Sequence, residues 1–131
     1  MPTEILMLVL TGLLSLVVAF LTIAIHFRAY GGKIIRGNRD DFPPLKGVPM
    51  RVVRAHANLN EALLPFAIIA LAAALLHVSN PLTIYAAIAF FAARMAHALL
   101  YLLGATPWRS IAYYCGLIAT LVFATQLPLG G

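Results

Sequence analysis

The chain has 131 residues, of which 63% are apolar and only 10% are charged, and its mean hydropathy is +0.95. Ordinary globular domains contain about 45–50% apolar and about 25% charged residues. So few charges cannot cover a water-exposed surface around such an apolar interior. The composition therefore excludes a soluble globular protein and indicates a single integral membrane domain over residues 1–131.

The net charge of +5 would suggest nucleic-acid binding in a soluble chain. Here the basic residues lie beside apolar segments, where membrane topology explains them better, so we expect no nucleic-acid partner. Cys115 is the single cysteine. An intrachain disulfide and a cysteine-based metal motif are therefore both excluded.

The first predicted helix covers about residues 5–27, and the stretch from Ile5 to Ile25 within it carries no charge. About 20 apolar residues suffice to cross a bilayer. A secretory signal is the alternative interpretation. However, the stretch lacks a basic region before it, follows Glu4, and ends in His26-Phe27-Arg28 instead of small residues. We therefore expect a retained membrane span.

Residues 28–49 form the longest polar segment, and we interpret them as an aqueous loop. Gly31-Gly32 and Pro43-Pro44 in it disfavour a continuous helix. Its charged residues are Arg28, Lys33, Arg36, Arg39, Asp40, Asp41 and Lys46. Three further helical spans are predicted at about 50–76, 82–103 and 109–127. The expected fold class is all-α, an integral membrane four-helix bundle.

The orientation follows from the basic residues, which lie in and around the 28–49 loop and at Arg109. The positive-inside rule places that loop and the 104–109 turn in the cytoplasm. Both termini and the 77–81 turn are then outside. We expect a multi-pass protein, of the inner or plasma membrane if its source is bacterial.

Polar residues recur at helical spacing inside the apolar helices, although charges there are costly. On the second helix they lie three or four positions apart, and the third and fourth helices carry similar stripes. The second helix carries Arg51, Arg54, Asn58 and Glu61, with Pro65 on the same face. The third carries Arg94, His97 and Tyr101, and the fourth carries Arg109 and Tyr113 with Ser110 adjacent. All three stripes fall in the cytoplasmic half of their helices, so we expect them to meet at one depth.

The plainest interpretation of these stripes is a buried ion pair between Glu61 and Arg94 that holds the bundle together. That pair leaves the other arginines unexplained. A cluster with more arginine than carboxylate attracts an anion, so a carboxylate-bearing ligand is the natural partner. His56 points away from this face, and we expect it to pack against a neighbouring helix or lie at the interface. The four histidines lack the spacing of metal ligands, so no metal is predicted.

The second helix reads Arg51-Val-Val-Arg54, then Asn58, Glu61 and Pro65-Phe66. This resembles the R-x-x-R-x-x-x-N-x-x-E-x-x-x-P-F signature of the MAPEG family, the membrane-associated proteins in eicosanoid and glutathione metabolism. The segments 91–101 and 107–113 look like the branch of microsomal prostaglandin E synthase and glutathione transferase. The resemblance covers essentially the whole chain.

The resemblance implies a homotrimer with glutathione sites between neighbouring subunits, open to the cytoplasm. The implied glutathione-binding residues are Arg51, Arg54, Asn58, Glu61, Arg94, His97, Tyr101, Arg109 and Tyr113. The implied catalytic residues are Arg109, Ser110 and Tyr113, with Arg109 beside the sulfur. Ala57 stands where the prostaglandin synthase branch has a second basic residue, which argues against prostaglandin H isomerisation.

The residue chemistry fits glutathione as cosubstrate, because Arg54 suits a carboxylate, Glu61 an ammonium and Asn58 a peptide group. The predicted activity is attack of a glutathione thiolate on an apolar electrophile or a lipid hydroperoxide that arrives through the bilayer. Two alternatives remain. One is a non-catalytic lipid-binding scaffold of the same family, and the other is a proton-coupled multidrug exporter that uses Glu61.

Overall fold

The structure is a computed structural model that describes residues 1–38, 40 and 42–128. It contains four long helices, α1 (Thr3–Tyr30), α3 (Gly47–Leu75), α4 (Pro81–Leu103) and α5 (Thr106–Ala124), and the short helix α2 (Gly32–Arg36). The described residues form no strand. The predicted all-α fold class is confirmed.

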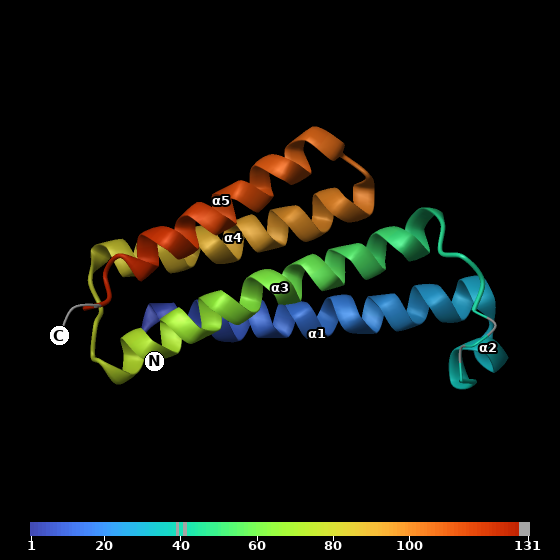
Figure 1. Ribbon diagram of the computed structural model, residues 1–131, viewed down its shortest axis with the longest axis horizontal. Coiled ribbons are helices and arrows are strands. Elements are labelled where there is room, and N and C mark those ends of the chain that lie inside the picture. The colour runs from blue at the N-terminus through green and yellow to red at the C-terminus, as the bar shows by residue number, and fades with distance from the viewer. Residues whose placement is uncertain (39, 41, 129–131) are drawn as a thin grey trace.

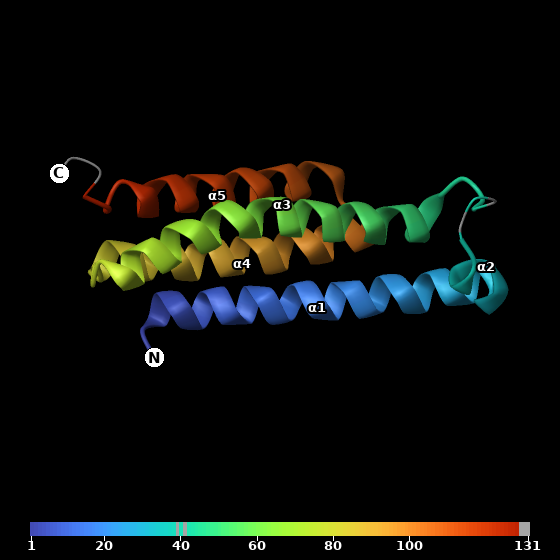
Figure 2. The same ribbon diagram turned by 60° about the horizontal axis from the view of Figure 1, so that its bottom comes forward.

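The four long helices run side by side as two pairs, α1 with α3 and α4 with α5 (Figure 1; Figure 2). Helices α3 and α4 each contact the other three long helices, so together they form the middle of the bundle. The start of α1 and the end of α5 lie at the same end of the bundle, and α2 lies at the other (Figure 1).

The four long helices differ from the predicted spans by at most three residues at either end. The largest difference falls in the 28–49 segment, which was expected to be loop throughout but contains the end of α1, the helix α2 and the start of α3. Gly31, with a φ of 79°, ends α1 because glycine adopts this backbone conformation without steric cost. The predicted loop residues Arg39 and Asp41 lie outside the described residues. Helix α5 ends at Ala124, three residues before the predicted boundary.

Three described helices, α1, α3 and α4, are long and apolar enough to cross a membrane. The fourth predicted span is a helix, α5, but it has only 19 residues and its first half carries Arg109, Ser110 and two tyrosines. Three of the four predicted spans are therefore long and apolar enough to cross a membrane. The polar half of α5 belongs to the site described below.

The turns at both ends of α4 are built from specific local signals. Asn80 caps the helix by accepting hydrogen bonds from the backbone N–H groups of Leu82 and Thr83, and Pro81 occupies the first turn. At the other end Gly104 has a left-handed φ of 74°. The close return of the chain at Gly104 places α5 against α4.

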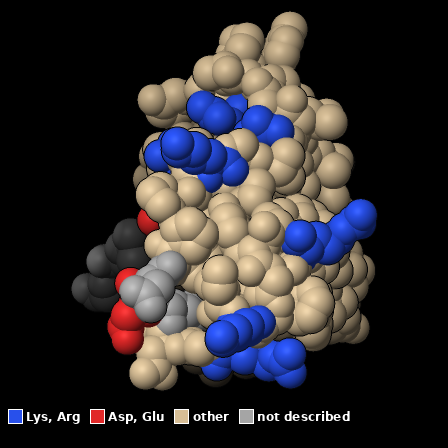
Figure 3. All heavy atoms as spheres, turned by 90° about the vertical axis from the view of Figure 1, so that its right-hand side faces the viewer, with Lys and Arg blue, Asp and Glu red and all other residues tan. Residues whose placement is uncertain are grey.

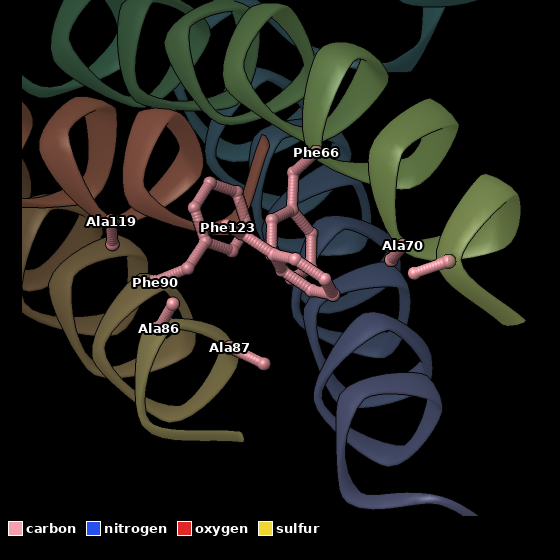
Figure 4. Packing of buried hydrophobic residues seen from close by; sticks show 8 residues of the cluster. Phe66, Ala70, Ala86, Ala87, Phe90, Ala119 and Phe123 are labelled. Carbon is pink, nitrogen blue, oxygen red and sulfur yellow. The ribbon is translucent and has the colours of Figure 1, made fainter. Parts of the chain in front are cut away.

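The larger buried cluster lies between α3, α4 and α5 and combines three phenylalanines with alanines (Figure 4). A second cluster joins α1, α3 and α4 through Val18, Val52, Leu59 and Ala98. The rings of Phe66 and Phe90 stack with centroids 3.9 Å apart, and Phe123 meets Phe66 edge-on at 5.8 Å. Alanine lets the helix backbones approach closely, as is usual in membrane bundles. Many large apolar side chains, such as Phe20 and Leu75, point outward, as lipid contact requires.

The two ends of the bundle differ in charge. We call the end formed by α2, the start of α3 and the α4–α5 turn the basic end, and Lys and Arg side chains are distributed over it (Figure 3). We call the other end, formed by the start of α1 and the turn between α3 and α4, the far end.

Candidate functional site

A polar cavity of about 210 Å³ lies between α3, α4 and α5, in the half of the bundle nearer the basic end. Its lining residues are Asn58, His97, Tyr101, Arg109, Ser110, Tyr113 and Tyr114. Helical spacing singled out five of these seven, and Ser110 was named as the neighbour of Arg109. Residues from the predicted polar stripes of α3, α4 and α5 thus line one cavity, although Asn58 is the single α3 residue among them.

Arg109 reaches this cavity from the first turn of α5. Its guanidinium carbon lies 4.3 Å from the centre of the Tyr101 ring, and Tyr101 itself is buried. This cation–π contact fixes the guanidinium against a rigid wall. The free N–H groups at the start of α5 add partial positive charge beside it. The cavity is therefore a suitable place for an anion.

His97 contributes a second polar group from α4. Its buried ring lies between Tyr101 and Tyr113, with centroid distances of 5.6 and 5.9 Å. Its Nε2 atom is buried and has no hydrogen-bond partner within the described chain. Because buried polar atoms are nearly always paired, a ligand in the cavity is the natural partner of this nitrogen.

Arg94 is almost fully buried, at 2% exposure, and crosses from α4 to α5. Its Nη2 donates to the backbone carbonyls of Tyr113 at 2.8 Å and Ala112 at 3.3 Å. The guanidinium thus bonds to α5, and the ion pair that was expected with Glu61 is not formed within this chain, where Glu61 is exposed. A long side chain such as that of Arg94 has several hydrogen-bond acceptors within reach. The spacing of residues along one helix does not predict which acceptor it bonds to.

Gly116 makes room for that crossing. A Cβ atom built at this position would lie 2.7 Å from Nε and 2.8 Å from Cζ of Arg94, distances that a real side chain does not adopt. Sequence reasoning missed Gly116. A single glycine inside an apolar helical run was the available signal, since it often marks a close approach.

A second cavity of about 300 Å³ lies next to the first and is mostly apolar. It is lined by Glu61, Ala62, Pro65, Ile69, Phe90, Arg94, Tyr113, Gly116, Leu117, Thr120 and Leu121. Tyr113 lines both cavities, so one wall of the polar chamber borders the apolar one. The sequence predicted neither this cavity nor the place of Tyr114 in the lining of the first one. Both depend on how α5 lies against α3 and α4.

The remaining predicted residues on α3 are separated in the structure. Arg51 donates from Nε to the backbone carbonyl of Leu102 at 3.2 Å, near the end of α4, and so already has a structural partner. Arg54 and Glu61 are exposed, and Asn58 between them is half-buried. Arg54 and Glu61 therefore present charge on the outer surface of a single chain.

His56 lies on the other face of α3, as predicted, and packs against α1. Its Nε2 is 2.9 Å from Asn60 Nδ2, and Ser15 donates to Asn60 Oδ1 at 2.6 Å. This small polar cluster links α1 to α3 and is separate from both cavities.

Comparison with known proteins supports the same conclusion as the motifs. The family model described as MAPEG family matches residues 5–127. No curated protein and no solved structure matches the chain. Since the family model covers nearly the whole sequence, the chain belongs to the MAPEG family.

Proposed function

We propose that this protein is a membrane-bound glutathione-dependent transferase or peroxidase. The observation that carries the proposal is the pairing of a polar cavity at the basic end with an adjoining apolar cavity, with Tyr113 on the wall of both. A thiol-bearing tripeptide with two carboxylates suits the first chamber, and an apolar electrophile from the bilayer suits the second. Such a pair of chambers brings a water-soluble and a lipid-soluble reactant together.

In the polar chamber, Arg109 is the proposed partner of the glutathione sulfur. A free thiol has a pKa of about 8.5 and is mostly protonated at neutral pH. A fixed guanidinium at a helix N-terminus lowers the pKa of a bound thiol and raises the thiolate population. The hydroxyl groups of Ser110 and Tyr113 line the same cavity and are candidate hydrogen-bond donors to the sulfur or to the departing group.

The chemical step then follows from the thiolate. Its sulfur forms a bond to an electrophilic carbon, and the leaving group departs with its electron pair or the adduct takes up a proton. With a lipid hydroperoxide, the thiolate sulfur attacks the terminal peroxide oxygen, the O–O bond breaks, and the alkoxide leaves and takes up a proton to become the lipid alcohol. A second glutathione thiolate then attacks the sulfur of the resulting sulfenic acid, which gives glutathione disulfide and releases water. Orientation of the two reactants supplies much of the rate gain, because lower thiol pKa also reduces nucleophilicity per thiolate.

Arg54, Asn58 and Glu61 are the proposed anchors for the two ends of glutathione, and His97 is a further polar contact. Arg54 and Glu61 lie exposed on one chain, and exposed charges within a membrane helix are costly. The polar cavity of about 210 Å³ is also smaller than typical ligand sites of about 300–1,000 Å³. Both observations support a homotrimer in which a neighbouring subunit covers these residues and completes the site.

The direct test is glutathione binding by the detergent-purified protein, measured together with the ultraviolet absorbance of the thiolate. We expect binding with thiolate formation at neutral pH and turnover of an apolar electrophile. Binding of a lipid without glutathione would instead identify the lipid-binding scaffold, which the apolar cavity alone would also suit. Proton-coupled efflux in vesicles without glutathione binding would identify the exporter.

A further inference from the structure

At the far end of the bundle, remote from the arginines of the polar cavity, Glu4 is buried at 4% exposure. It lies in the first turn of α1. Its Oε1 accepts a hydrogen bond from Thr83 Oγ1 at 2.6 Å and another from Ser79 Oγ at 2.9 Å. Two hydroxyl groups from the start of α4 and the turn before it thus hold one oxygen of this carboxyl group.

The other oxygen, Oε2, is buried and has no hydrogen-bond partner within the described chain. A buried acceptor left unpaired is destabilising, and more so if it carries charge. Glu4 therefore presents an acceptor for which a partner outside the described chain is needed.

Glu4 lines a cavity of about 230 Å³ that could hold such a partner. The other lining residues are Pro2, Ile5, Ala70, Ala73, Ala74, His77, Val78 and Ser79. The space exceeds the roughly 30 Å³ that one water molecule occupies in the liquid. Most of the lining is apolar, so the cavity suits a ligand with a small polar head that would meet Glu4 and an apolar portion that would meet the alanines.

We propose that this cavity binds a primary ammonium group through Glu4, as carried by the ethanolamine headgroup of an aminophospholipid or by a free primary amine. An ammonium donates N–H hydrogen bonds and neutralises the carboxylate. The described residues hold no group of three side chains suited to a metal ion. Because Glu4 lies in the first turn of the apolar helix α1, we expect it near the lipid headgroups when α1 crosses a bilayer. The exposed His77 on the cavity wall suits a neighbouring phosphate.

The proposal is independent of the glutathione site and is tested on the full chain in detergent. Equal amounts of phosphatidylethanolamine, phosphatidylcholine and phosphatidylglycerol are added, and the retained lipids are counted by native mass spectrometry. We expect preferential retention of phosphatidylethanolamine, because the quaternary head of phosphatidylcholine has no N–H to donate. Equal retention of the three lipids, with no effect of added ethanolamine, would overturn the proposal.

Soluble ethanolamine then identifies the source of the ammonium group. Displacement of bound phosphatidylethanolamine by ethanolamine would mean that the head alone suffices. Preferential retention of the lipid that ethanolamine does not displace would assign the site to the intact lipid.

The key variant is Glu4→Gln, which keeps an acceptor for Thr83 and Ser79 but removes the charge. It should weaken the selective retention by about tenfold or more, the factor expected for loss of a charge-assisted contact. Thr83→Val is the matched comparison, because it removes one hydrogen bond to Glu4 and keeps the carboxylate. We expect it to retain most of the preference.

Ala74→Leu provides a second test should Glu4→Gln fail to fold, because Ala74 lines the cavity and a larger side chain there should narrow it while Glu4 stays intact. It should also abolish the preference, whereas Ala89→Leu, on the exposed face of α4, should not. Unchanged selectivity in both Glu4→Gln and Ala74→Leu would contradict the proposal.

Discussion

The guanidinium of Arg94 occupies the space that a side chain at position 116 would fill, because Nε lies 2.7 Å from where a Cβ atom of residue 116 would stand. This contact fixes how far α5 is shifted along α4, because Gly116 must lie opposite Arg94. It also places Tyr113, whose carbonyl accepts from Arg94, between the polar and the apolar cavity.

Gly116→Ala should therefore destabilise the bundle, since overpacking a buried site costs about 1–3 kcal/mol. The measurement is the thermal midpoint of unfolding in detergent. Gly12→Ala is the matched control, because a Cβ at Gly12 meets nothing within 4 Å. The control should leave stability unchanged or raise it, as alanine is the better helix former. Equal midpoints for the two variants would show that Arg94 moves aside at no cost.

Arg109→Leu should leave glutathione binding nearly intact but raise the pKa of the bound thiol. Turnover should fall by about tenfold to a thousandfold, as for loss of one electrostatic stabiliser. A pH titration of thiolate absorbance in the wild type and the variant measures the shift. Arg28→Leu, at an exposed arginine on α1, is the control for loss of one positive charge. Coincident titration curves and equal turnover would make Arg109 an anchor for lipid headgroups only.

Arg54→Ala should raise the dissociation constant of glutathione by about tenfold or more, because a charge-assisted hydrogen bond contributes about 1.5–3 kcal/mol. Calorimetry on the assembled protein is the measurement, with Arg36→Ala on α2 as the control. Glu61→Gln is a less clean test of the same site, since Glu61 also lines the apolar cavity. Unchanged affinity in a correctly assembled Arg54→Ala protein would remove this residue from the binding set.

Leu117→Trp should partly fill the apolar cavity and raise the KM for a large apolar electrophile, while the dissociation constant of glutathione stays near the wild-type value. The adjacent residue supplies the control, because Ile118 is exposed and does not line that cavity. Steady-state kinetics with a small and a large electrophile separate the two outcomes. Equal effects of Leu117→Trp and Ile118→Trp would place the electrophile elsewhere.

The exposed charges of Arg54 and Glu61 predict that subunits associate in mild detergent, because a neighbouring subunit would remove these charges from lipid. The family resemblance makes a homotrimer the expected assembly. Chemical cross-linking and native mass measurement test the assembly. A population of monomers alone would leave both charges uncovered and contradict the prediction. Antiparallel dimers would favour the exporter.

Much of this protein follows from the sequence alone. Long apolar segments with few charges dictate membrane helices, since no other solvent suits them. The spacing of Asn58, His97 and Arg109 within their helices also predicts that polar groups gather in one place. Local periodicity determines which residues share a helix face, and the family signature rests on the same spacing.

Only the tertiary structure decided which partner each face meets. Arg51 and Arg54 share a face of α3, yet one bonds to the end of α4 while the other is exposed. Arg94 bonds to α5 instead of Glu61, and Glu4, which the sequence places at the start of a span, is buried against Thr83. The physical reason is that a helix fixes directions only within itself. The contacts of a long or charged side chain depend on how neighbouring helices approach and which acceptors they bring within reach.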